Sequence, residues 1–275
     1  PGFDKDSTML LMPAWDPGKN AGVKVVVVSP HNREKDLPTI QGTYLYFDSP
    51  TGTLKAILEA KTLTNKRTAA ASALASRYLS RKNASSLLLI GTGSLSPDLV
   101  RAHCSVRSIN QVWIYGRSLQ KAQRIANILE EEGFPATAIE DLDSFIPKAD
   151  IISCATTSDS PLFSGKLLQK GQHLDLVGSY RPNMREVDDD AILQSSVFLD
   201  NYVGGMKETG DIVIPIKKGV LDPDSIKADL FELCSKIKPG RQTAEEITLF
   251  KSVGHALEDL AAADYYFEKF QNKNS

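Results

Sequence analysis

The sequence predicts an α/β fold in which a Rossmann-like dinucleotide-binding domain is joined to a smaller, β-rich domain. Three observations lead to this prediction. β-rich runs dominate residues 8–60, apolar strands alternate with helices from about residue 82, and the loop "GTGSLSP" follows the first of these strands. Apolar strands that alternate with helices indicate a parallel sheet covered on both faces. A chain of 275 residues is long enough for one large or two medium domains.

The first part of the chain is expected to form an antiparallel sheet followed by a helix. Residues 8–15, 22–30 and 42–48 are rich in strand-forming types, and "DSPTG" (48–52) is a turn that leads into residues 53–60. Residues 62–80 are rich in Ala and Leu at helical spacing, and Thr62 or Thr64 is the expected N-cap of this helix.

The second part predicts alternating strands and helices. Strands are expected in residues 86–90, 111–118, 149–157, 173–179 and 196–201. Pro97 can start one helix at its first position, and Gly133 closes a second helix that begins near residue 119. Residues 243–270 are expected to be a long helical stretch with a capping box from Thr243 and Glu246 and a potential interruption at 252–254.

These elements predict two domains. Residues 81–245 form the dinucleotide-binding domain, and residues 1–80 with 246–275 form a substrate-binding and dimerisation domain whose last helix returns to the first sheet.

Composition excludes several classes of partner. A net charge of −2 and a pI of about 6.2 do not indicate nucleic acid or an acidic membrane. No apolar run reaches the roughly 18–20 residues of a membrane span, and no signal peptide is seen, so a cytoplasmic protein is expected. Cys104, Cys154 and Cys234 are scattered and indicate reduced thiols. The four histidines show no ligand spacing, so no metal site is expected.

The loop at residues 91–97 predicts a nucleotide site. Gly91 permits a tight turn, and Gly93 lets the backbone approach a pyrophosphate at the N-terminus of the next helix. The third glycine of the usual fingerprint is absent, because Ser96 and Pro97 stand there. An ordinary strand–helix turn is the alternative, and the βαβ context favours the nucleotide.

The end of the second parallel strand, "YGRS", indicates which nucleotide binds. An NAD site usually carries an acid here, which holds the ribose 2′-hydroxyl. This chain has Gly116, followed by Arg117 and Ser118, which suit a 2′-phosphate. NADP(H) is therefore predicted as the preferred cofactor, with NAD(H) as the second choice and a solvated surface arginine as the alternative.

Two cations lie outside the Rossmann-like part. Lys24 interrupts the apolar strand "GVKVVVV", and Arg67 lies in the first turns of an Ala-rich helix. Each alone is explained by a solvent-facing side chain, but together they would form a receptor for a carboxylate.

Several motifs together resemble the ornithine cyclodeaminase/mu-crystallin family over nearly the whole chain. They are "LTNKRTAAASALA", "LLIGTGSLSP", "YGRS", "VGSYRPNMREVDD", "MKETGDI" and "LFKSVGHALEDLAAA". The chain starts late relative to the family, and an N-terminal segment with a substrate-binding arginine is expected to be missing. The resemblance implies that Lys24 and Arg67 bind the carboxylate of an amino or imino acid. It also implies a set of cofactor contacts: Thr39, Gly91, Gly93, Ser94, Leu95, Gly116, Arg117, Ser118, Thr156, Val177, Ser179, Ser252 and Val253.

Tyr180 separates the branches of that family. Cyclodeaminases carry a catalytic aspartate at the matching position, and a tyrosine, with a pKa near 10, is a poor substitute for it. The resemblance therefore implies an NAD(P)H-dependent ketimine reductase that acts on Δ1-pyrroline-2-carboxylate and Δ1-piperideine-2-carboxylate, with Lys24 and Arg67 as its catalytic residues. Tyr180 shapes the substrate pocket or hydrogen-bonds the carboxylate, and a homodimer is expected. The alternatives are ornithine cyclodeaminase, an L-amino acid dehydrogenase, and a non-catalytic NADPH- or ligand-binding protein such as mu-crystallin.

Overall fold

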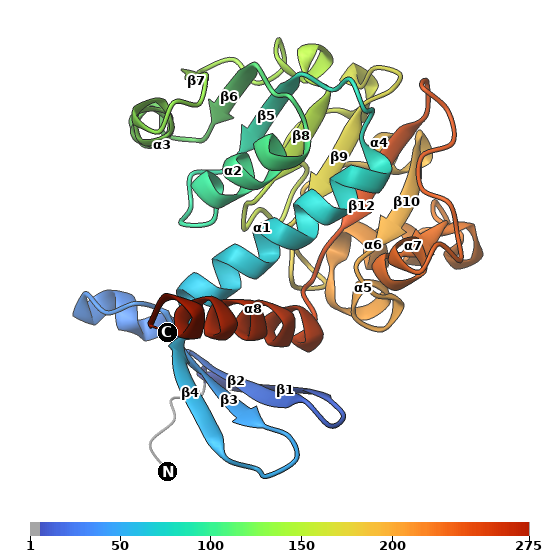
Figure 1. Cartoon of the computed structure of the whole chain (residues 1–275). Coiled ribbons are helices and arrows are strands. Elements are labelled where there is room, and N and C mark those ends of the chain that lie inside the picture. The colour runs from blue at the N-terminus through green and yellow to red at the C-terminus, as the bar shows by residue number, and fades with distance from the viewer. Residues whose placement is uncertain (1–5, 275) are drawn as a thin grey trace. The chain divides into compact units, whose positions relative to one another are not determined.

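The structure, a computed structural model, describes residues 6–274 (Figure 1). The chain divides into two compact units, of which the first comprises residues up to Arg67 and from His255 on, and the second is Thr68–Gly254. These junctions differ from the predicted 80/81 and 245/246, because one helix straddles the first junction and a strand of the second unit follows residue 245. In the described part of the chain, no helix combines the length and the apolar character that crossing a membrane requires.

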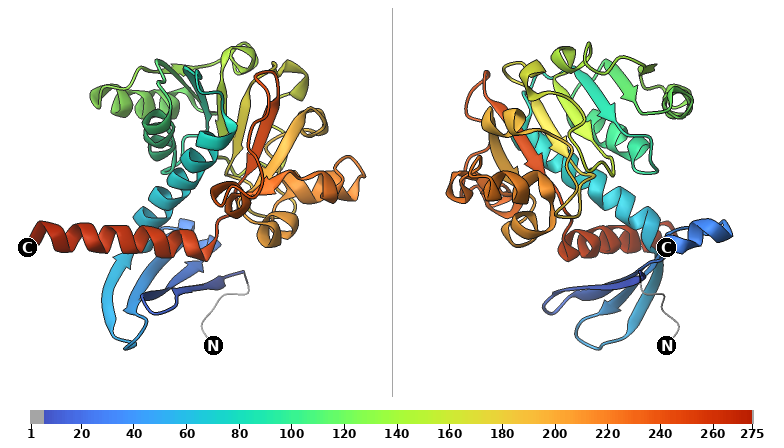
Figure 2. Two further views of the ribbon diagram at one scale, coloured as in Figure 1. Left: turned by 45° about the vertical axis from the view of Figure 1, so that its right-hand side comes forward. Right: turned by 180° about the vertical axis from the view of Figure 1, so that it is seen from behind.

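The first unit is a four-stranded antiparallel sheet with a helix on one face, as the sequence predicted for residues 8–60. The strands follow the chain order β1 (Thr8–Asp16), β2 (Asn20–Val28), β3 (Ile40–Asp48) and β4 (Leu54–Glu59). A 3₁₀ helix, Pro30–Lys35, connects β2 and β3. Helix α8 (Ala256–Asn274) lies across one face of the sheet in all the views (Figures 1 and 2). Tyr44 and Tyr46 of β3 pack there against Leu260 and Ala263 of α8.

Helix α1 (Ala60–Leu79) begins earlier than predicted. The carboxylate of Glu59 accepts hydrogen bonds from the backbone N–H of Lys61 (2.8 Å) and Thr62 (2.6 Å). Glu59 therefore satisfies the first amides of the helix, and the prediction of Thr62 or Thr64 as the N-cap is wrong.

The second unit is an eight-stranded parallel sheet in the order β11-β10-β12-β9-β8-β5-β6-β7. Its strands are β5 (Ser86–Ile90), β6 (Gln111–Tyr115), β7 (Ala136–Ile139), β8 (Ile151–Cys154), β9 (His173–Leu176), β10 (Ser195–Leu199), β11 (Ala228–Asp229) and β12 (Ile247–Lys251). The helices are α2 (Ser96–Val106), α3 (Leu119–Glu131), α4 (Asp189–Leu193), α5 (Tyr202–Glu208), α6 (Gly210–Lys217) and α7 (Leu230–Cys234). The α/β fold class is confirmed, as is the close of α3 at Gly133, which has a φ of 87°. Helix α2 begins at Ser96, so Pro97 lies at its second position, one later than predicted.

Both faces of this sheet are covered. Leu87 and Leu89 of β5 pack with α2 and α3 on one face, whereas Leu88 and Ile90 pack into the core of the other. This alternation follows from the two-residue period of a strand, and it explains why the strands read as continuous apolar runs.

Strand β12 corrects the prediction of one long helix over residues 243–270. The amide of Glu246 does donate to Thr243 Oγ1 (3.1 Å), but this bond closes a turn, and no helix follows it. Residues 247–251 instead form a fully buried strand between β9 and β10. A short apolar run does not distinguish a buried strand from a buried helix, and here the two neighbouring strands supply the hydrogen bonds that decide.

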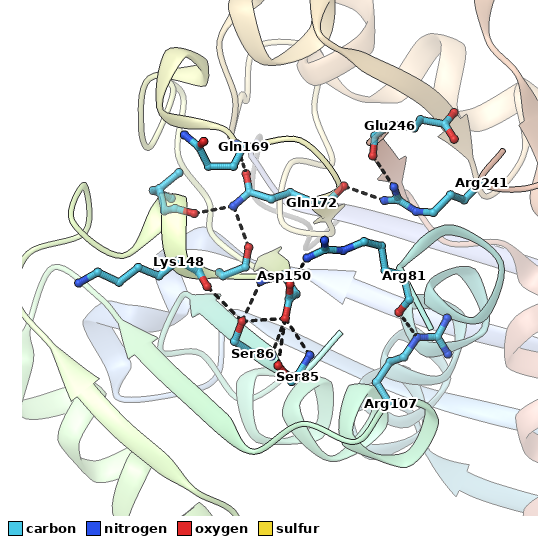
Figure 3. Close-up of polar contacts among 12 residues, drawn as sticks. Arg81, Ser85, Ser86, Arg107, Lys148, Asp150, Gln169, Gln172, Arg241 and Glu246 are labelled. Carbon is cyan, nitrogen blue, oxygen red and sulfur yellow. Dashed lines mark hydrogen bonds and ion pairs between the residues drawn. The ribbon is translucent and has the colours of Figure 1, made fainter. Parts of the chain in front are cut away.

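A polar network fixes the amino-terminal edge of the sheet (Figure 3). Asp150, just before β8, accepts hydrogen bonds from the backbone N–H of Ser85 (2.8 Å) and Ser86 (3.1 Å) and pairs with Arg81. Burial raises the pKa of Asp150, but these hydrogen bonds outweigh it and hold the pKa below its usual value. Arg241 donates to the carbonyls of Gln172 (2.9 Å) and Glu246. This edge is tied together by its own groups, and the candidate site lies at the opposite, carboxyl edge.

Candidate functional site

The carboxyl edge of the parallel sheet has a topological switch between β5 and β8. The chain runs outward from β5 through β6 and β7 and then returns to β8 on the other side of β5. Gly91 ends β5 with a φ of 136°, and a Cβ on it would lie 2.6 Å from the carbonyl oxygen of Ala155, which follows β8. Only glycine fits this crossing of two backbones. Ligands of open α/β sheets bind at such switch points.

The loop from Gly91 to Ser96 leaves one side open. No heavy atom lies within 4 Å of the position that a Cβ of Gly93 would occupy, and both Gly93 and Ser94 are exposed. Leu95 precedes α2 and packs partly against the core of the unit. Ser96, in the place of the third glycine, is fully buried, and its hydroxyl donates to the carbonyl oxygen of Gly91 (3.0 Å). The serine therefore closes the loop by a hydrogen bond where the usual fingerprint has a glycine.

The end of β6 lies beside this loop. A Cβ on Gly116 would lie 2.6 Å from Cγ2 of Thr92, so a side chain at this position requires Thr92 to move. Arg117 is exposed and makes no hydrogen bond or ion pair with other described residues. The hydroxyl of Ser118 caps α3 by accepting a long hydrogen bond from the amide of Lys121 (3.4 Å).

The loops after β8 and β9 are held by one buried carboxylate, that of Glu186. It accepts hydrogen bonds from the backbone N–H (2.7 Å) and hydroxyl (2.9 Å) of Thr156 and from the backbone N–H of Gly178 (2.8 Å). A Cβ on Gly178 would lie 2.0 Å from the carbonyl oxygen of Thr156, so these two loops touch through their backbones. Val177 donates its amide to the carbonyl of Cys154 (2.8 Å) and thereby extends the ladder between β8 and β9.

Glu186 belongs to a buried ionic cluster that the sequence analysis missed. Lys251 of β12 lies 3.2 Å from Asp211 and 4.0 Å from Glu186, and all three side chains are fully buried. Burial raises the pKa of Glu186, while the charge of Lys251 lowers it and that of Asp211 raises it again. Lys251 was visible in the sequence as a single cation in the apolar run "ITLFKS". That pattern is the same as the one that drew attention to Lys24.

A second missed carboxylate, Asp200, holds the segment after β12. It accepts hydrogen bonds from the hydroxyl of Ser252 (3.2 Å) and from the amides of Val253 (2.7 Å) and Gly254 (2.6 Å). Ser252 and Val253 were predicted as cofactor contacts, and Asp200 fixes both at the carboxyl end of β12. Its signal in the sequence was an acid that ends an apolar strand, in "SVFLDN".

Ser179 and Tyr180, which follow β9, have opposite environments. The hydroxyl of Ser179 is buried, donates to the carbonyl of Met184 (2.7 Å) and lies 2.9 Å from the hydroxyl of Thr209. Tyr180 is 45% exposed, and the guanidinium of Arg181 stacks over its ring at 5.3 Å. Ser179 therefore anchors the loop, and Tyr180 leaves its ring at the surface.

In the first unit, Lys24 faces helix α8. Its side chain is only 3% exposed, so a solvent-facing lysine is not what the structure shows. The ammonium lies 2.7 Å from Oδ2 and 2.9 Å from Oδ1 of Asp259 on α8. Burial and the charge of Arg67 lower the pKa of Lys24 below its usual value of 10.5, and Asp259 opposes this change.

Arg67 of α1 is 8% exposed and meets the same helix. Its Nε lies 3.0 Å from Oδ1 of Asp259, and its Nη1 donates to Oε2 of Glu258 at 2.7 Å. The structure therefore brings the two predicted cations to one carboxylate, since Asp259 contacts both. The pair that would bind a substrate carboxylate is assembled within this unit.

Tyr44 lies next to the group formed by Lys24, Arg67 and Asp259. It lies opposite Lys24 in the register of β2 and β3, and its hydroxyl is buried without a hydrogen-bond partner among the described residues. Burial and the charge of Asp259 raise its pKa above the usual value, so the phenol stays neutral. A Cβ on Gly22 would lie 2.1 Å from this hydroxyl, so Gly22 makes the room that the ring requires.

The predicted cofactor contacts fall into both units. Thr39 lies in the first unit, where its carbonyl accepts from the amide of Ser29 (2.8 Å) before β3 begins. The others lie in the loops that follow β5, β6, β8, β9 and β12, which all end at the same edge of the parallel sheet.

This edge fits a dinucleotide. Gly91 and Gly178 let backbones approach closely, and Gly116 lies close to the side chain of Thr92. The open side of Gly93 leads to the N-terminus of α2. Exposed backbone amides at a helix N-terminus favour a pyrophosphate. Hydrogen bonds to the carboxylates of Glu186 and Asp200 fix the loops around Thr156 and Val253. A site for the reactive end of a cofactor requires loops that are fixed in this way.

Comparison with known proteins gives a consistent result. The sequence matches the ornithine cyclodeaminase/mu-crystallin family over residues 2–274. It is 39% identical over 272 residues to a Δ1-pyrroline-2-carboxylate reductase of Bacillus cereus, with 98% of this chain and 83% of that protein covered. The structure is similar to that of Thermococcus litoralis Δ1-pyrroline-2-carboxylate reductase in complex with NADH and L-proline (TM-score 0.92, 34% identity, 98% and 84% of the two chains). It is also similar to an archaeal alanine dehydrogenase dimer with bound NAD (TM-score 0.91, 28% identity, 99% and 84%).

Proposed function

This chain belongs to the ornithine cyclodeaminase/mu-crystallin family, and from that premise we propose that it reduces cyclic ketimine carboxylates with NADPH. The proposed substrates are Δ1-pyrroline-2-carboxylate and Δ1-piperideine-2-carboxylate, and the products are L-proline and L-pipecolate. The family and the enzyme class predicted from the motifs, an oxidoreductase, are confirmed. Relatives with bound NAD or NADH support a nicotinamide cofactor.

The observation that carries the proposal is the pair of buried cations. Lys24 and Arg67 are 3% and 8% exposed and both contact Asp259, so their positions are fixed before any ligand binds. Two cations held side by side suit a carboxylate, and an arginine can bind it through two parallel hydrogen bonds. An imino acid has such a carboxylate next to the C=N carbon that is reduced.

The residues of this chain then have simple tasks. A reduced nicotinamide, when bound, supplies the hydride that converts the C=N bond into an amine. Lys24 and Arg67 hold the carboxylate and orient the imine, which in its protonated form is already electrophilic, so positioning provides most of the catalysis. Hydride transfer leaves a neutral amine, whose nitrogen takes up one more proton. Lys24, whose pKa is lowered by burial, or a water molecule beside it supplies that proton.

The preference for NADPH rests on the end of β6. Gly116 lacks the acid that would repel a 2′-phosphate, and its close approach to Thr92 leaves little room for one. Arg117 is exposed at the same strand end, where it can pair with the phosphate. Two relatives with solved structures contain NADH or NAD, so cofactor preference is a property to measure on this chain.

Two other activities are tested beside this one. The similarity to the archaeal alanine dehydrogenase makes an L-amino acid dehydrogenase the second candidate, which would reduce an imine formed from a 2-oxo acid and ammonia. Ornithine cyclodeaminase is disfavoured because Tyr180 is an exposed phenol stacked on Arg181 and stands where that branch has an acid.

We also propose that the chain forms a homodimer through its antiparallel sheet. The face of β1–β4 opposite α8 is apolar and exposed, with Met9 at 49%, Leu11 at 63%, Trp15 at 63% and Ile57 at 65%. A contiguous apolar face of this kind is usually covered by a partner. The archaeal alanine dehydrogenase of similar structure is a dimer.

A turnover assay tests the function. The purified protein should oxidise NADPH in the presence of Δ1-pyrroline-2-carboxylate and should release no ammonia from L-ornithine with NAD⁺ or NADP⁺. Pyruvate with ammonia should be reduced far more slowly. Arg67→Ala should raise KM and lower kcat/KM by about two orders of magnitude or more, because it removes the group that orients the imine. Absence of turnover with the ketimine, while NADPH still binds, would leave the non-catalytic binding protein as the better description.

A further inference from the structure

The two carboxylates that face Lys24 and Arg67 differ in burial and in partners. Asp259 is fully buried and contacts both cations. Glu258 is 16% exposed, and its Oε2 contacts Nη1 of Arg67. Asp259 is therefore the fixed counter-ion of the pair, and Glu258 reaches the guanidinium from the more accessible side.

Among the described contacts, the four charges of this cluster balance without a ligand. Two cations, Lys24 and Arg67, face two carboxylates, Asp259 and Glu258. A plain carboxylate that binds Arg67 would add an uncompensated negative charge and would compete with Glu258 for the same guanidinium. A protonated imino acid or an amino acid brings a carboxylate together with a positive nitrogen, so its net charge is zero and the balance is preserved.

We propose that Glu258 exchanges partners when the substrate binds, so that it releases Arg67 to the substrate carboxylate and pairs with the positive nitrogen beside that carboxylate. This inference rests on the proposed function, because it takes Arg67 as the carboxylate anchor. The nitrogen is one carbon away from the carboxylate, so the displaced Glu258 stays within reach of it. Glu258 is then a specificity-determining residue, and it selects zwitterionic imino and amino acids over plain carboxylates.

Two ring compounds distinguish the release of Arg67 to the ligand carboxylate from the pairing of Glu258 with the ligand nitrogen. L-Proline has the carboxylate and the positive nitrogen, whereas cyclopentanecarboxylate has the same ring size and carboxylate without the nitrogen. Their affinities are measured by calorimetry on the protein saturated with oxidised cofactor, so the measurement does not require turnover. Glu258→Gln is the test variant, and Glu268→Gln, an exposed glutamate on the same helix, is the control for the lost charge.

The exchange predicts different responses for the two ligands. In Glu258→Gln, cyclopentanecarboxylate should bind about tenfold tighter, since its competitor for Arg67 is gone. L-Proline should bind no tighter than to the wild type, since the freed guanidinium is offset by the partner that its nitrogen loses. Glu258→Asp keeps the charge and should restore at least part of the preference for L-proline. Glu268→Gln should leave both affinities unchanged.

Three other results would be decisive against the exchange. Equal changes for both ligands in Glu258→Gln would mean that Glu258 only competes and does not pair with the nitrogen. Unchanged affinities would mean that Glu258 stays on Arg67 or is irrelevant to the ligand. If wild-type protein binds neither compound, Arg67 is not a carboxylate site and the proposed function falls with the exchange. If wild-type protein binds both but does not reduce the ketimine, only the proposed function fails.

Discussion

Replacement of Asp259 by Asn should destabilise the first unit through Lys24. The variant keeps the shape of the side chain but leaves the buried ammonium of Lys24 beside a neutral amide, and Arg67 retains Glu258. Removing one partner of a buried ion pair typically costs about 3–5 kcal/mol. The loss has an upper limit, because Lys24 can lose its proton instead. From its usual pKa of 10.5, deprotonation at pH 7 would cost about 4.8 kcal/mol at about 1.36 kcal/mol per pH unit, and the lowered pKa of Lys24 in the folded chain keeps the cost below this value. We therefore expect a loss of about 3–4.5 kcal/mol at pH 7.

The pH dependence identifies the cause. Asp259 raises the pKa of Lys24, so the variant lowers the folded-state pKa further below that of the unfolded chain. The unfolded chain then binds more protons, and stability rises with pH up to about 10.5. The deficit of Asp259→Asn, measured by urea unfolding, should therefore be largest at pH 7 and should shrink towards pH 10. Asp264→Asn is the matched control, because Asp264 lies on the same helix and hydrogen-bonds the neutral groups of Tyr46 and Asn20. A loss below about 1 kcal/mol, or a loss that stays constant with pH, would refute the argument that Asp259 compensates a buried ammonium.

Four further predictions follow from the same structure. Arg117→Ala should weaken NADPH by about 1.5–3 kcal/mol, the range of a charge-assisted hydrogen bond, and leave NADH nearly unchanged; equal effects in a fluorescence titration would contradict the 2′-phosphate assignment. Tyr180→Phe should change kcat/KM less than Arg67→Ala does, and complete loss of turnover would make Tyr180 the proton donor. Gly91→Ala should abolish cofactor binding or folding, because its Cβ would lie 2.6 Å from a carbonyl oxygen at a φ of 136°; near-normal NADPH binding would show that the loop adapts. Trp15→Lys should shift the protein towards monomer in light scattering, provided that the exposed face of β1–β4 is the dimer contact.

Much of the fold was predictable because its signals are local. The four-stranded sheet and most of the parallel strands follow from strand-forming runs and turn residues, and helices α2 and α3 from Pro97 and Gly133. Strand β12 was missed because its outcome depends on partners that are distant in the sequence, and the start of α1 was missed because the nearby Glu59, not a threonine, satisfies the first amides of the helix. Residues 247–251 become a strand only because β9 and β10 lie on either side.

The candidate site was also predictable only in part. The glycine loop, "YGRS" and the two cations in apolar surroundings were visible as residues. The carboxylates that hold these groups in place were not predicted. Glu186 and Asp259 look like ordinary acids in the sequence, and Asp200 is marked only as an acid that ends an apolar strand. Burial and the direction of each hydrogen bond identify their roles, and both come from tertiary contacts.

The sequence by itself determined the class of this protein: an α/β chain with a dinucleotide loop, no acid at the end of β6, and two cations in apolar surroundings. These conclusions depend on the residue types in short segments, which local steric and charge rules constrain. The tertiary structure alone decided that Lys24 turns towards α8, that Asp259 lies between Lys24 and Arg67, and that Glu258 occupies the guanidinium of Arg67. Lys24 and Asp259 are 235 residues apart in the chain. Whether a charge is solvated or paired depends on which side chains folding brings within a few ångströms of it, and no local pattern encodes that.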